Sequence, residues 1–169
     1  LNGYGFTQWE DILNLLNAQP GKQVLSNTHR LLKDRNYLIL SEIGELADES
    51  IKINESQSLV LTPFGQLSIT KADAIEETVK HIAYVDAKFL KFPLTLRQWQ
   101  EGDYFHPSGM TGKKKLSKYF KDEKLSLLDK ENVWLLCSGD DVVWILNHRS
   151  DNRFIVTEDT KDILKIEIK

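Results

Sequence analysis

The stretch of residues 134–146, "WLLCSGDDVVWIL", decides the fold class because it places two apolar runs on either side of a polar turn signal. The runs occupy residues 134–137 and 142–146, and the Ser-Gly-Asp-Asp between them is of the kind that favours a tight turn. Short apolar runs flanking such a turn predict a β-hairpin. We expect Trp134 and Trp144, one in each run, to lie in the protein core.

Working outward from this hairpin, most other periodic segments also predict strands, so the expected fold class is α+β and strand-dominated. The predicted strands and hairpins cover residues 22–26, 29–33, 37–42, 59–70, 84–90, 94–99, 153–157 and 163–168. Residues 76–82 fit either a short helix or an exposed strand. One helix is predicted near the N-terminus, where a capping box from Thr7 to Glu10 begins a run with apolar residues at helical spacing: Trp9, Ile12, Leu13 and Leu16.

The charge of the chain is unevenly distributed. The net charge is −3, yet residues 109–124 hold six lysines against Asp122 and Glu123, a local charge of +4 that leaves −7 for the remainder. A compact basic segment on an otherwise acidic chain focuses positive potential on one part of the surface.

Composition also restricts the class of protein. A single cysteine, Cys137, excludes an internal disulfide framework and favours a reducing compartment, so we expect a cytoplasmic protein. No apolar run approaches the roughly 18 residues that span a bilayer, and no membrane partner is expected. Because the chain opens on Leu1 without a leader pattern, we interpret it as a fragment of a longer protein.

The residue types that carry catalysis or bind metals do not cluster in the sequence. The four histidines, at positions 29, 81, 106 and 148, are far apart and lack the spacing of a metal site. Cys137 lies inside an apolar run, where a thiol behaves as a small buried hydrophobe. We therefore predict no catalytic residue and no metal site in this chain. Trp99, at the end of a predicted strand, can be either a core residue or a stacking platform.

The segment "GMTGKKKLSKYF", residues 109–120, is the main candidate for binding. On a helical wheel Leu116, Tyr119 and Phe120 form a narrow apolar stripe, and Lys114, Lys118 and Lys121 fall on the opposite side. This pattern predicts a short helix anchored by its aromatic stripe with ammonium groups facing outward. A nucleotide-binding loop is disfavoured, because no strand-loop-helix fingerprint surrounds the glycines. A merely solvated lysine face stays open.

A longer stretch around this segment, "FPLTLRQWQEGDYFHPSGMTGKKKLSKYFKDEK" (residues 92–124), closely resembles the C-terminal domain of the tRNA(Ile)-lysidine synthetase family. The matching motif residues are Pro93, Leu94, Arg97, Gly102, Asp103, Pro107, Gly109, Met110, Gly112, Lys114, Lys115, Leu116, Ser117 and Phe120. Farther along, Trp144, Arg149, Asp151, Arg153, Phe154 and Thr157 match the final strands of the family. Two positions depart from the family pattern: Tyr104 stands where an arginine is common, and Asn147 stands where a glycine is common.

The resemblance implies a domain plan. Residues 83–169 would be the C-terminal tRNA-binding domain, a β/β/α module similar to one in the phenylalanyl-tRNA synthetase β subunit. Residues 1–45 would be the end of the middle domain, and residues 46–82 a connector with strands.

The resemblance also implies a function for the parent enzyme, which uses ATP and Mg to join lysine to the wobble cytidine of tRNA(Ile) with a CAU anticodon. The Ser-Gly-Gly-x-Asp-Ser loop of its catalytic domain is absent from this sequence, so we expect the fragment to be inactive alone. Its expected partners are tRNA(Ile), through the acceptor stem, and the catalytic N-terminal domain of the same chain; a homodimer stays open.

The residues predicted to bind tRNA are cationic. Lysines suit the phosphates of double-stranded RNA, and arginines can make directed, forked contacts. The predicted set is Arg97, Lys113, Lys114, Lys115, Lys118, Lys121, Arg149 and Arg153. The arginines can instead be structural partners of Asp103 or Asp151. The alternative function is a protein-interaction or self-association module whose lysines meet an acidic surface, for which residues 42–58 are a candidate.

Overall fold

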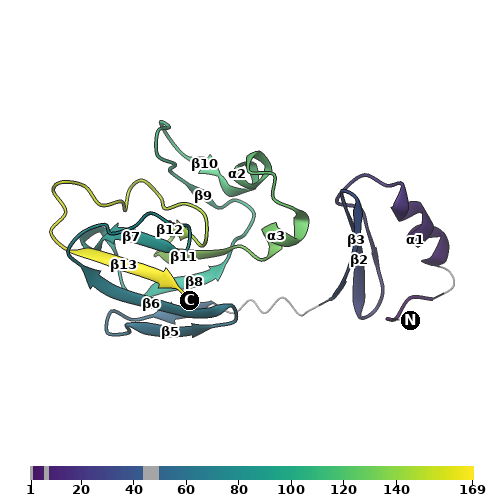
Figure 1. The fold of residues 1–169 in the computed structure, drawn as a ribbon, viewed down its shortest axis with the longest axis horizontal. Helices are drawn as coiled ribbons and strands as arrows, with labels where there is room; N and C mark the ends of the chain where they lie inside the picture. Colours follow the sequence, from purple (N-terminus) through teal and green to yellow (C-terminus); the bar gives the residue numbers. More distant parts are fainter. Residues whose placement is uncertain (1, 6–7, 44–49) are drawn as a thin grey trace. The chain divides into compact units, whose positions relative to one another are not determined.

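A computed structural model describes residues 2–5, 8–43 and 50–169 (Figure 1). The chain forms two compact units. Unit 1 comprises Leu1–Ala47 together with Leu125–Lys130, and unit 2 comprises Asp48–Lys124 together with Glu131–Lys169.

Unit 1 pairs a helix with a small antiparallel sheet whose strands follow one another in chain order. The strands predicted over residues 29–33 and 37–42 pair with each other and are joined by a tight turn in which Arg35 adopts a φ of +50°. The predicted strands of this region are therefore confirmed. The helix is α1 (Trp9–Leu16), and the strands are β1 (Gln23–Leu25), β2 (His29–Asp34) and β3 (Tyr37–Glu42). All but the last residue of the short helix α3 (Leu127–Glu131) is assigned to this unit as well.

Helix α1 buries a different face from the predicted stripe. Leu15 is buried and Ile12 is half-buried, whereas Trp9, Leu13 and Leu16 are exposed. A three-stranded sheet is narrow and covers only one side of the helix, so one leucine reaches it while neighbouring apolar residues do not. Of the predicted capping box, Thr7 lies outside the described residues, and the observed N-cap makes no side-chain capping bond.

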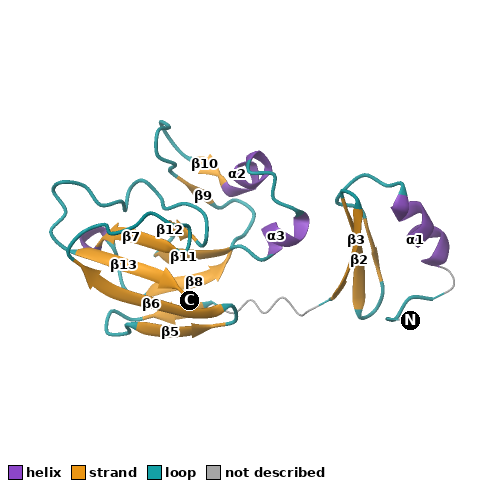
Figure 2. Ribbon diagram, viewed as in Figure 1, coloured by secondary structure: helices purple, strands orange, loops and turns teal. Residues whose placement is uncertain are grey.

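Unit 2 contains two four-stranded antiparallel sheets (Figure 2). The hairpin predicted over residues 134–146 is confirmed, and it lies at one edge of the first sheet. In spatial order the first sheet is β12 (Asp141–Ile145), β11 (Trp134–Ser138), β8 (Leu94–Gln98) and β4 (Ile51–Ile53). The second sheet is β5 (Leu59–Thr62), β6 (Gly65–Ala72), β13 (Ile163–Ile168) and β7 (Ile82–Asp86).

The two sheets share one hydrophobic cluster. Leu96, Leu136 and Trp144 from the first sheet and Leu67 and Ile166 from the second are at most 1% exposed. Each such side chain contributes about 1.5–3 kcal/mol when fully buried. The strand-dominated α+β class is thereby confirmed. The predicted core position of Trp144 is confirmed as well. The tryptophan of β11 is half-buried and packs against the same cluster.

Two predicted strands differ in the structure. Residues 153–157 form no strand; only Ile155 makes an isolated bridge, because the backbone turns at Asp151 and Arg153 to satisfy a buried carboxylate. The strand predicted over residues 84–90 instead ends at Asp86, whose side chain accepts from the Lys88 amide and starts the 3-10 helix η2 (Ala87–Phe89).

The segment expected to be a connector, residues 46–82, supplies β4, β5 and β6 to the sheets of unit 2. Residues 44–49 lie outside the described part of the chain. Residues 76–81 form neither of the two predicted elements, since β7 begins only at Ile82.

Candidate nucleic-acid interface

The lysine-rich segment folds as a two-stranded ribbon followed by a helix. The ribbon is formed by β9 (Tyr104–Phe105) and β10 (Lys114–Lys115), and α2 (Leu116–Asp122) begins directly after it. Gly109 and Gly112, in the loop between the strands, have φ values of +78° and +91°, a conformation that side-chain-bearing residues rarely adopt. The prediction that these glycines shape the turn leading into a short helix is confirmed.

Helix α2 is held by the aromatic stripe that the sequence predicts. Leu116 and Phe120 are fully buried and Tyr119 is 4% exposed. Phe105 packs edge-on against Tyr119 at a centroid distance of 5.1 Å, and Trp99 packs against Phe120 at the same distance. Such aromatic pairs add about 0.5–1.5 kcal/mol beyond the area that they bury. The helix therefore presents one fixed face to solvent.

The predicted row of lysines is wrong for Lys114. Because α2 begins at Leu116, Lys114 lies on β10 and not on the helical face of Lys118 and Lys121. Its side chain is only 17% exposed, and its ammonium makes a 2.8 Å ion pair with Asp122. The hydrogen bond from Lys114 lowers the pKa of the Asp122 carboxyl, so this carboxylate is ionised at neutral pH.

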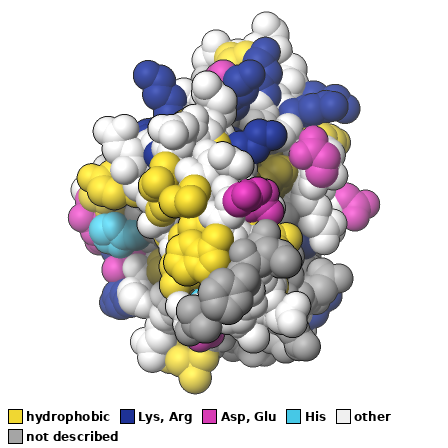
Figure 3. All heavy atoms as spheres, turned by 90° about the vertical axis from the view of Figure 1, so that its right-hand side faces the viewer, with side chains coloured by type: hydrophobic (Ala, Val, Ile, Leu, Met, Phe, Trp, Pro, Cys, Tyr) yellow, Lys and Arg dark blue, Asp and Glu magenta, His cyan; other side chains and the backbone are white. Residues whose placement is uncertain are grey.

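Four of the predicted lysines converge on one cavity. It has a volume of about 340 Å³ and is lined by Met110, Lys113, Lys114, Lys115, Lys118 and Asp122. Lys113 places its ammonium 4.4 Å from the centroid of the Tyr104 ring, a cation–π contact that holds the charge at this edge. Figure 3 shows Lys and Arg side chains gathered at the top of that view, the height at which β10 and α2 lie in Figure 1.

The remaining lysines of the cavity are open to solvent. Lys115 and Lys118 are exposed and make no ion pair with any residue that the structure describes. Four ammonium groups against one carboxylate give the cavity a formal charge of +3. Lys121 is also exposed but is not among the lining residues.

Arg97 acts on this region through Asp103. Its guanidinium makes two parallel hydrogen bonds to the Asp103 carboxylate, each 2.8 Å long, and these bonds raise the pKa of Arg97. The Asp103 carboxylate also accepts from the Gln100 amide, and its backbone carbonyl accepts from the Leu116 amide, the first residue of α2. The pair therefore positions the turn before β9 and the start of the helix.

Arg153 belongs to a second structural cluster, centred on the fully buried Asp151. The Asp151 carboxylate accepts from the Arg153 guanidinium and backbone amide and from the backbone amide of His106, and Arg153 also reaches Asp141 at 2.7 Å. Burial alone would raise the pKa of Asp151, but the hydrogen bonds from Arg153 and His106 outweigh it and lower the pKa. This cluster ties the end of β9 to the segment after β12.

The third arginine also has a protein partner. Arg149 is exposed, and it interacts with the buried phenol of Tyr119. Burial raises the pKa of Tyr119, while the hydrogen bond and charge of Arg149 act in the opposite direction. None of the three predicted arginines lines the lysine cavity.

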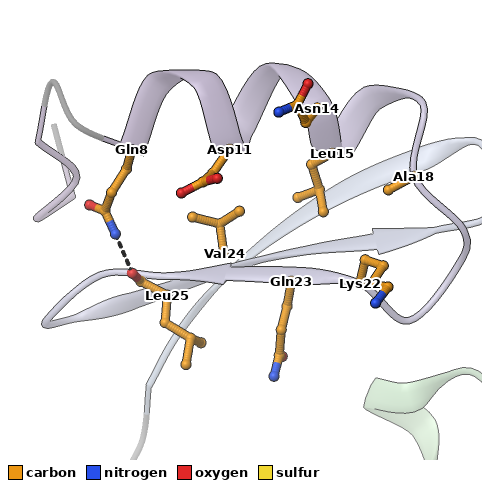
Figure 4. A pocket seen from close by; sticks show the side chains of 9 residues that line it. All are labelled: Gln8, Asp11, Asn14, Leu15, Ala18, Lys22, Gln23, Val24 and Leu25. Carbon is orange, nitrogen blue, oxygen red and sulfur yellow. Dashed lines mark hydrogen bonds between the residues drawn. The ribbon is translucent and has the colours of Figure 1, made fainter.

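A larger groove, about 590 Å³, lies in unit 1 between α1 and β1 (Figure 4). Gln8 donates to the Leu25 carbonyl across one end, and the acid Asp11 and the base Lys22 are both among the residues that line the groove. This mixture of charges and short polar side chains does not select one sign of ligand. The smaller lysine cavity is the better candidate, because four lysines line it against a single acid, Asp122.

No group of three or more His, Cys, Asp or Glu residues within residues 2–5, 8–43 and 50–169 could hold a metal ion. Cys137 is 1% exposed, and burial raises the pKa of its thiol to about 11, which suppresses the reactive thiolate. No described helix is long and apolar enough to cross a membrane.

Two cavity residues were not predicted to belong to a binding site: Met110, which is 57% exposed, and Asp122. Met110 appeared only as a motif residue and Asp122 only as a term in the local charge. If the helix is taken to begin at Leu116, Lys114 lies outside it and no longer shares its solvent-facing side. No local sequence signal predicts that Lys114 pairs with Asp122.

Comparison with known proteins gives consistent matches in both units. Residues 1–43 match the family model described as "TilS substrate binding domain", and residues 94–168 match "TilS substrate C-terminal domain". The tRNA(Ile)-lysidine synthase of Parabacteroides distasonis is 46% identical over 97% of this chain, and that of Bacteroides thetaiotaomicron is 38% identical over 98%. The chain covers 39% and 37% of these two relatives, so it spans about two fifths of their length.

A solved structure shares the fold. It is described as "Crystal structure of TILS C-terminal domain" and superposes with a TM-score of 0.57 at 16% identity. The match covers 71% of this chain and 98% of the solved one. At this identity the likeness concerns the fold alone, and it agrees with the β/β/α module predicted for the C-terminal region.

Proposed function

This chain belongs to the tRNA(Ile)-lysidine synthase family, and we propose that within such a protein its β9–β10–α2 surface binds tRNA through its phosphate groups. The observation that carries the proposal is the convergence of Lys113, Lys114, Lys115 and Lys118 on one cavity of formal charge +3. Double-stranded RNA presents phosphates and 2′-hydroxyls more readily than base edges, so ammonium groups on a rigid surface suit it. The acceptor stem is the part of the tRNA that we assign to this surface.

The arginines take a different role in this proposal. Arg97 and Arg153 are engaged by carboxylates, and Arg149 interacts with Tyr119, so all three position the elements that carry the lysines. Direct phosphate contacts come from the lysines, including Lys121 on the exposed side of α2. Lysine is a point charge that tolerates varied phosphate geometry, which fits binding that does not read the sequence.

The chemistry of the whole protein lies outside these residues. We propose that the parent joins lysine to the wobble cytidine of tRNA(Ile) with ATP and Mg, in a catalytic domain that this chain does not contain. The role of this chain is to hold the substrate. In the isolated chain we expect tRNA binding without lysine incorporation, and incorporation by the chain alone would contradict this division of labour.

The binding proposal is tested by salt titration of the 169-residue chain against tRNA. Removing two phosphate contacts with the Lys115→Ala/Lys118→Ala variant is expected to weaken binding about tenfold and to lower the log–log salt slope by about 2. Both side chains are exposed, so thermal unfolding should stay unchanged.

The matched control is Lys80→Ala/Lys161→Ala, which removes two exposed lysines elsewhere on unit 2 and should bind as the unmodified chain does. Equal slopes for the two double variants would contradict the proposal. Binding of an acidic peptide to the chain, without any binding of tRNA, would favour the protein-interaction alternative.

A further inference from the structure

The lysine cavity differs from an ordinary phosphate-tracking surface in its shape. A backbone-tracking surface spreads its cations along a groove, because phosphodiesters carry one charge each and are spaced along the strand. Here Lys113, Lys114, Lys115 and Lys118 surround a single cavity of about 340 Å³. Four lysines that line one space favour a ligand that concentrates its negative charge in one group.

Such a ligand is a phosphate monoester. At neutral pH a monoester carries a charge of about −1.5 to −2 and three strong acceptor oxygens, whereas each backbone phosphodiester carries −1. The formal charge of +3 in the cavity, four lysines less Asp122, therefore exceeds what one phosphodiester can balance. A monoester balances most of it.

Asp122 prepares the cavity for this ligand by holding Lys114. The 2.8 Å ion pair fixes the Lys114 ammonium while using one of its three hydrogens, so two hydrogens remain as donors. Lys113 is held independently by the Tyr104 ring at 4.4 Å. Two of the four ammonium groups are thus positioned before any ligand binds, which lowers the entropy that binding would otherwise cost.

The lining of the cavity also offers an apolar contact. Met110 is 57% exposed between Gly109 and Gly112, and it lines the same cavity as the lysines. A terminal base pair exposes a flat apolar face that an internal base pair hides, and a thioether packs favourably against aromatic rings. A charged cavity beside an exposed methionine therefore fits the end of a strand better than its interior.

We propose that this cavity binds the terminal phosphate monoester of an RNA strand, with Lys113, Lys114, Lys115 and Lys118 around the phosphate and Met110 against the terminal nucleotide. That the ligand is RNA rests on the proposed function. The inference adds that the surface recognises an end of the RNA, so a chemical group on the terminal nucleotide contributes to binding.

The test compares RNA hairpins of one sequence whose ends differ: 5′-phosphate, 5′-hydroxyl, and 5′-hydroxyl with 3′-phosphate. Binding to the 169-residue chain is measured by fluorescence anisotropy at one salt concentration. We expect one phosphorylated hairpin to bind about fivefold to tenfold more tightly than the hydroxyl form. The arm that shows the preference identifies which end is bound.

Two variants separate the cavity from the surrounding charge. In Lys115→Ala/Lys118→Ala the ratio between phosphorylated and hydroxyl hairpins should fall toward 1. Lys121→Ala removes an exposed lysine of α2 that does not line the cavity, so it should weaken both hairpins and leave the ratio unchanged.

The outcomes distinguish the two proposals. Equal binding of all hairpins, with lysine-dependent and salt-dependent affinity intact, would overturn the end-recognition inference and leave the proposed function standing. Loss of the preference in Lys121→Ala as well would also overturn it, because general charge would then explain the effect. Absence of lysine-dependent RNA binding would overturn both.

Discussion

Two groups of cations lie in unit 2, and they are used differently. Arg97 pairs with Asp103, and Arg153 pairs with Asp151. The side chains of these two acids are 15% and 0% exposed. The lysines at 115 and 118 face solvent and make no ion pair with any described residue. The first group connects segments of the fold, and the second is available to a ligand.

The difference follows from the chemistry of the two side chains. A guanidinium is planar and forks onto a carboxylate, so it satisfies a buried acid at a modest desolvation cost. An ammonium on a flexible stem is strongly hydrated and remains exposed unless a specific acid holds it. Lys114 lies between the groups, since it is paired with Asp122 and yet lines the cavity. Substitutions in each group should therefore separate stability from RNA affinity.

The largest expected effect is on stability, from Asp151→Asn. Asp151 is fully buried and accepts hydrogen bonds from Arg153 and His106, and the amide keeps the shape but loses the charge. We expect the free energy of unfolding to fall by about 3 kcal/mol in urea denaturation. The exposed Asp140→Asn should change it by less than about 0.5 kcal/mol. Equal stability of the two variants would show that the cluster is not structural.

The same carboxylate predicts a dependence on pH. Its pKa in the folded protein is lowered relative to the ordinary value of about 3.9, so its contribution is present above that value and is lost as the pH falls through the folded pKa. Between pH 6 and pH 3 the unmodified chain should lose more stability than Asp151→Asn. A parallel loss in both proteins would contradict this assignment.

An intermediate effect is expected from Arg97→Lys, which keeps the charge and removes the fork. Because one ammonium cannot reproduce both 2.8 Å bonds to Asp103, we expect a loss of about 1 kcal/mol in unfolding free energy. RNA affinity should fall about twofold to fivefold with an unchanged salt slope, since Asp103 also holds the first residue of α2. A direct phosphate contact by Arg97 instead predicts weaker RNA binding with unchanged stability.

The smallest expected effect is a gain, from Asp122→Asn. Removing this carboxylate raises the charge of the cavity by one, which outweighs the loss of the ion pair that positions Lys114. RNA affinity should therefore rise about twofold to threefold, and the salt slope should steepen by up to about 1. Glu123→Gln is the matched control, because it removes a neighbouring exposed charge that does not line the cavity. The same gain in both variants would assign the effect to general charge.

Local patterns predicted most of the strands and hairpins, together with the anchoring face of α2. The hairpin of residues 134–146 was predicted from two apolar runs that flank a turn signal. The stripe of Leu116, Tyr119 and Phe120 was predicted from spacing, because a helix repeats its buried side at a fixed period. Residues 153–157 have the composition of a strand and are not one. The backbone amide of Arg153 instead donates to the Asp151 carboxylate, which also accepts from the amide of His106, a residue distant in the sequence.

The amino-acid sequence by itself determined that this chain is strand-rich, carries a basic segment on an acidic background and has the motif of its family. These properties depend on composition and on short-range periodicity. Only the tertiary structure decided which cations are free. Lys114, predicted on the helical face, lies on β10 and pairs with Asp122, and Arg97 pairs with Asp103. Such ion pairs depend on where the folded backbone brings two side chains together. The lysine cavity exists for the same reason: its shape belongs to the ribbon and helix together.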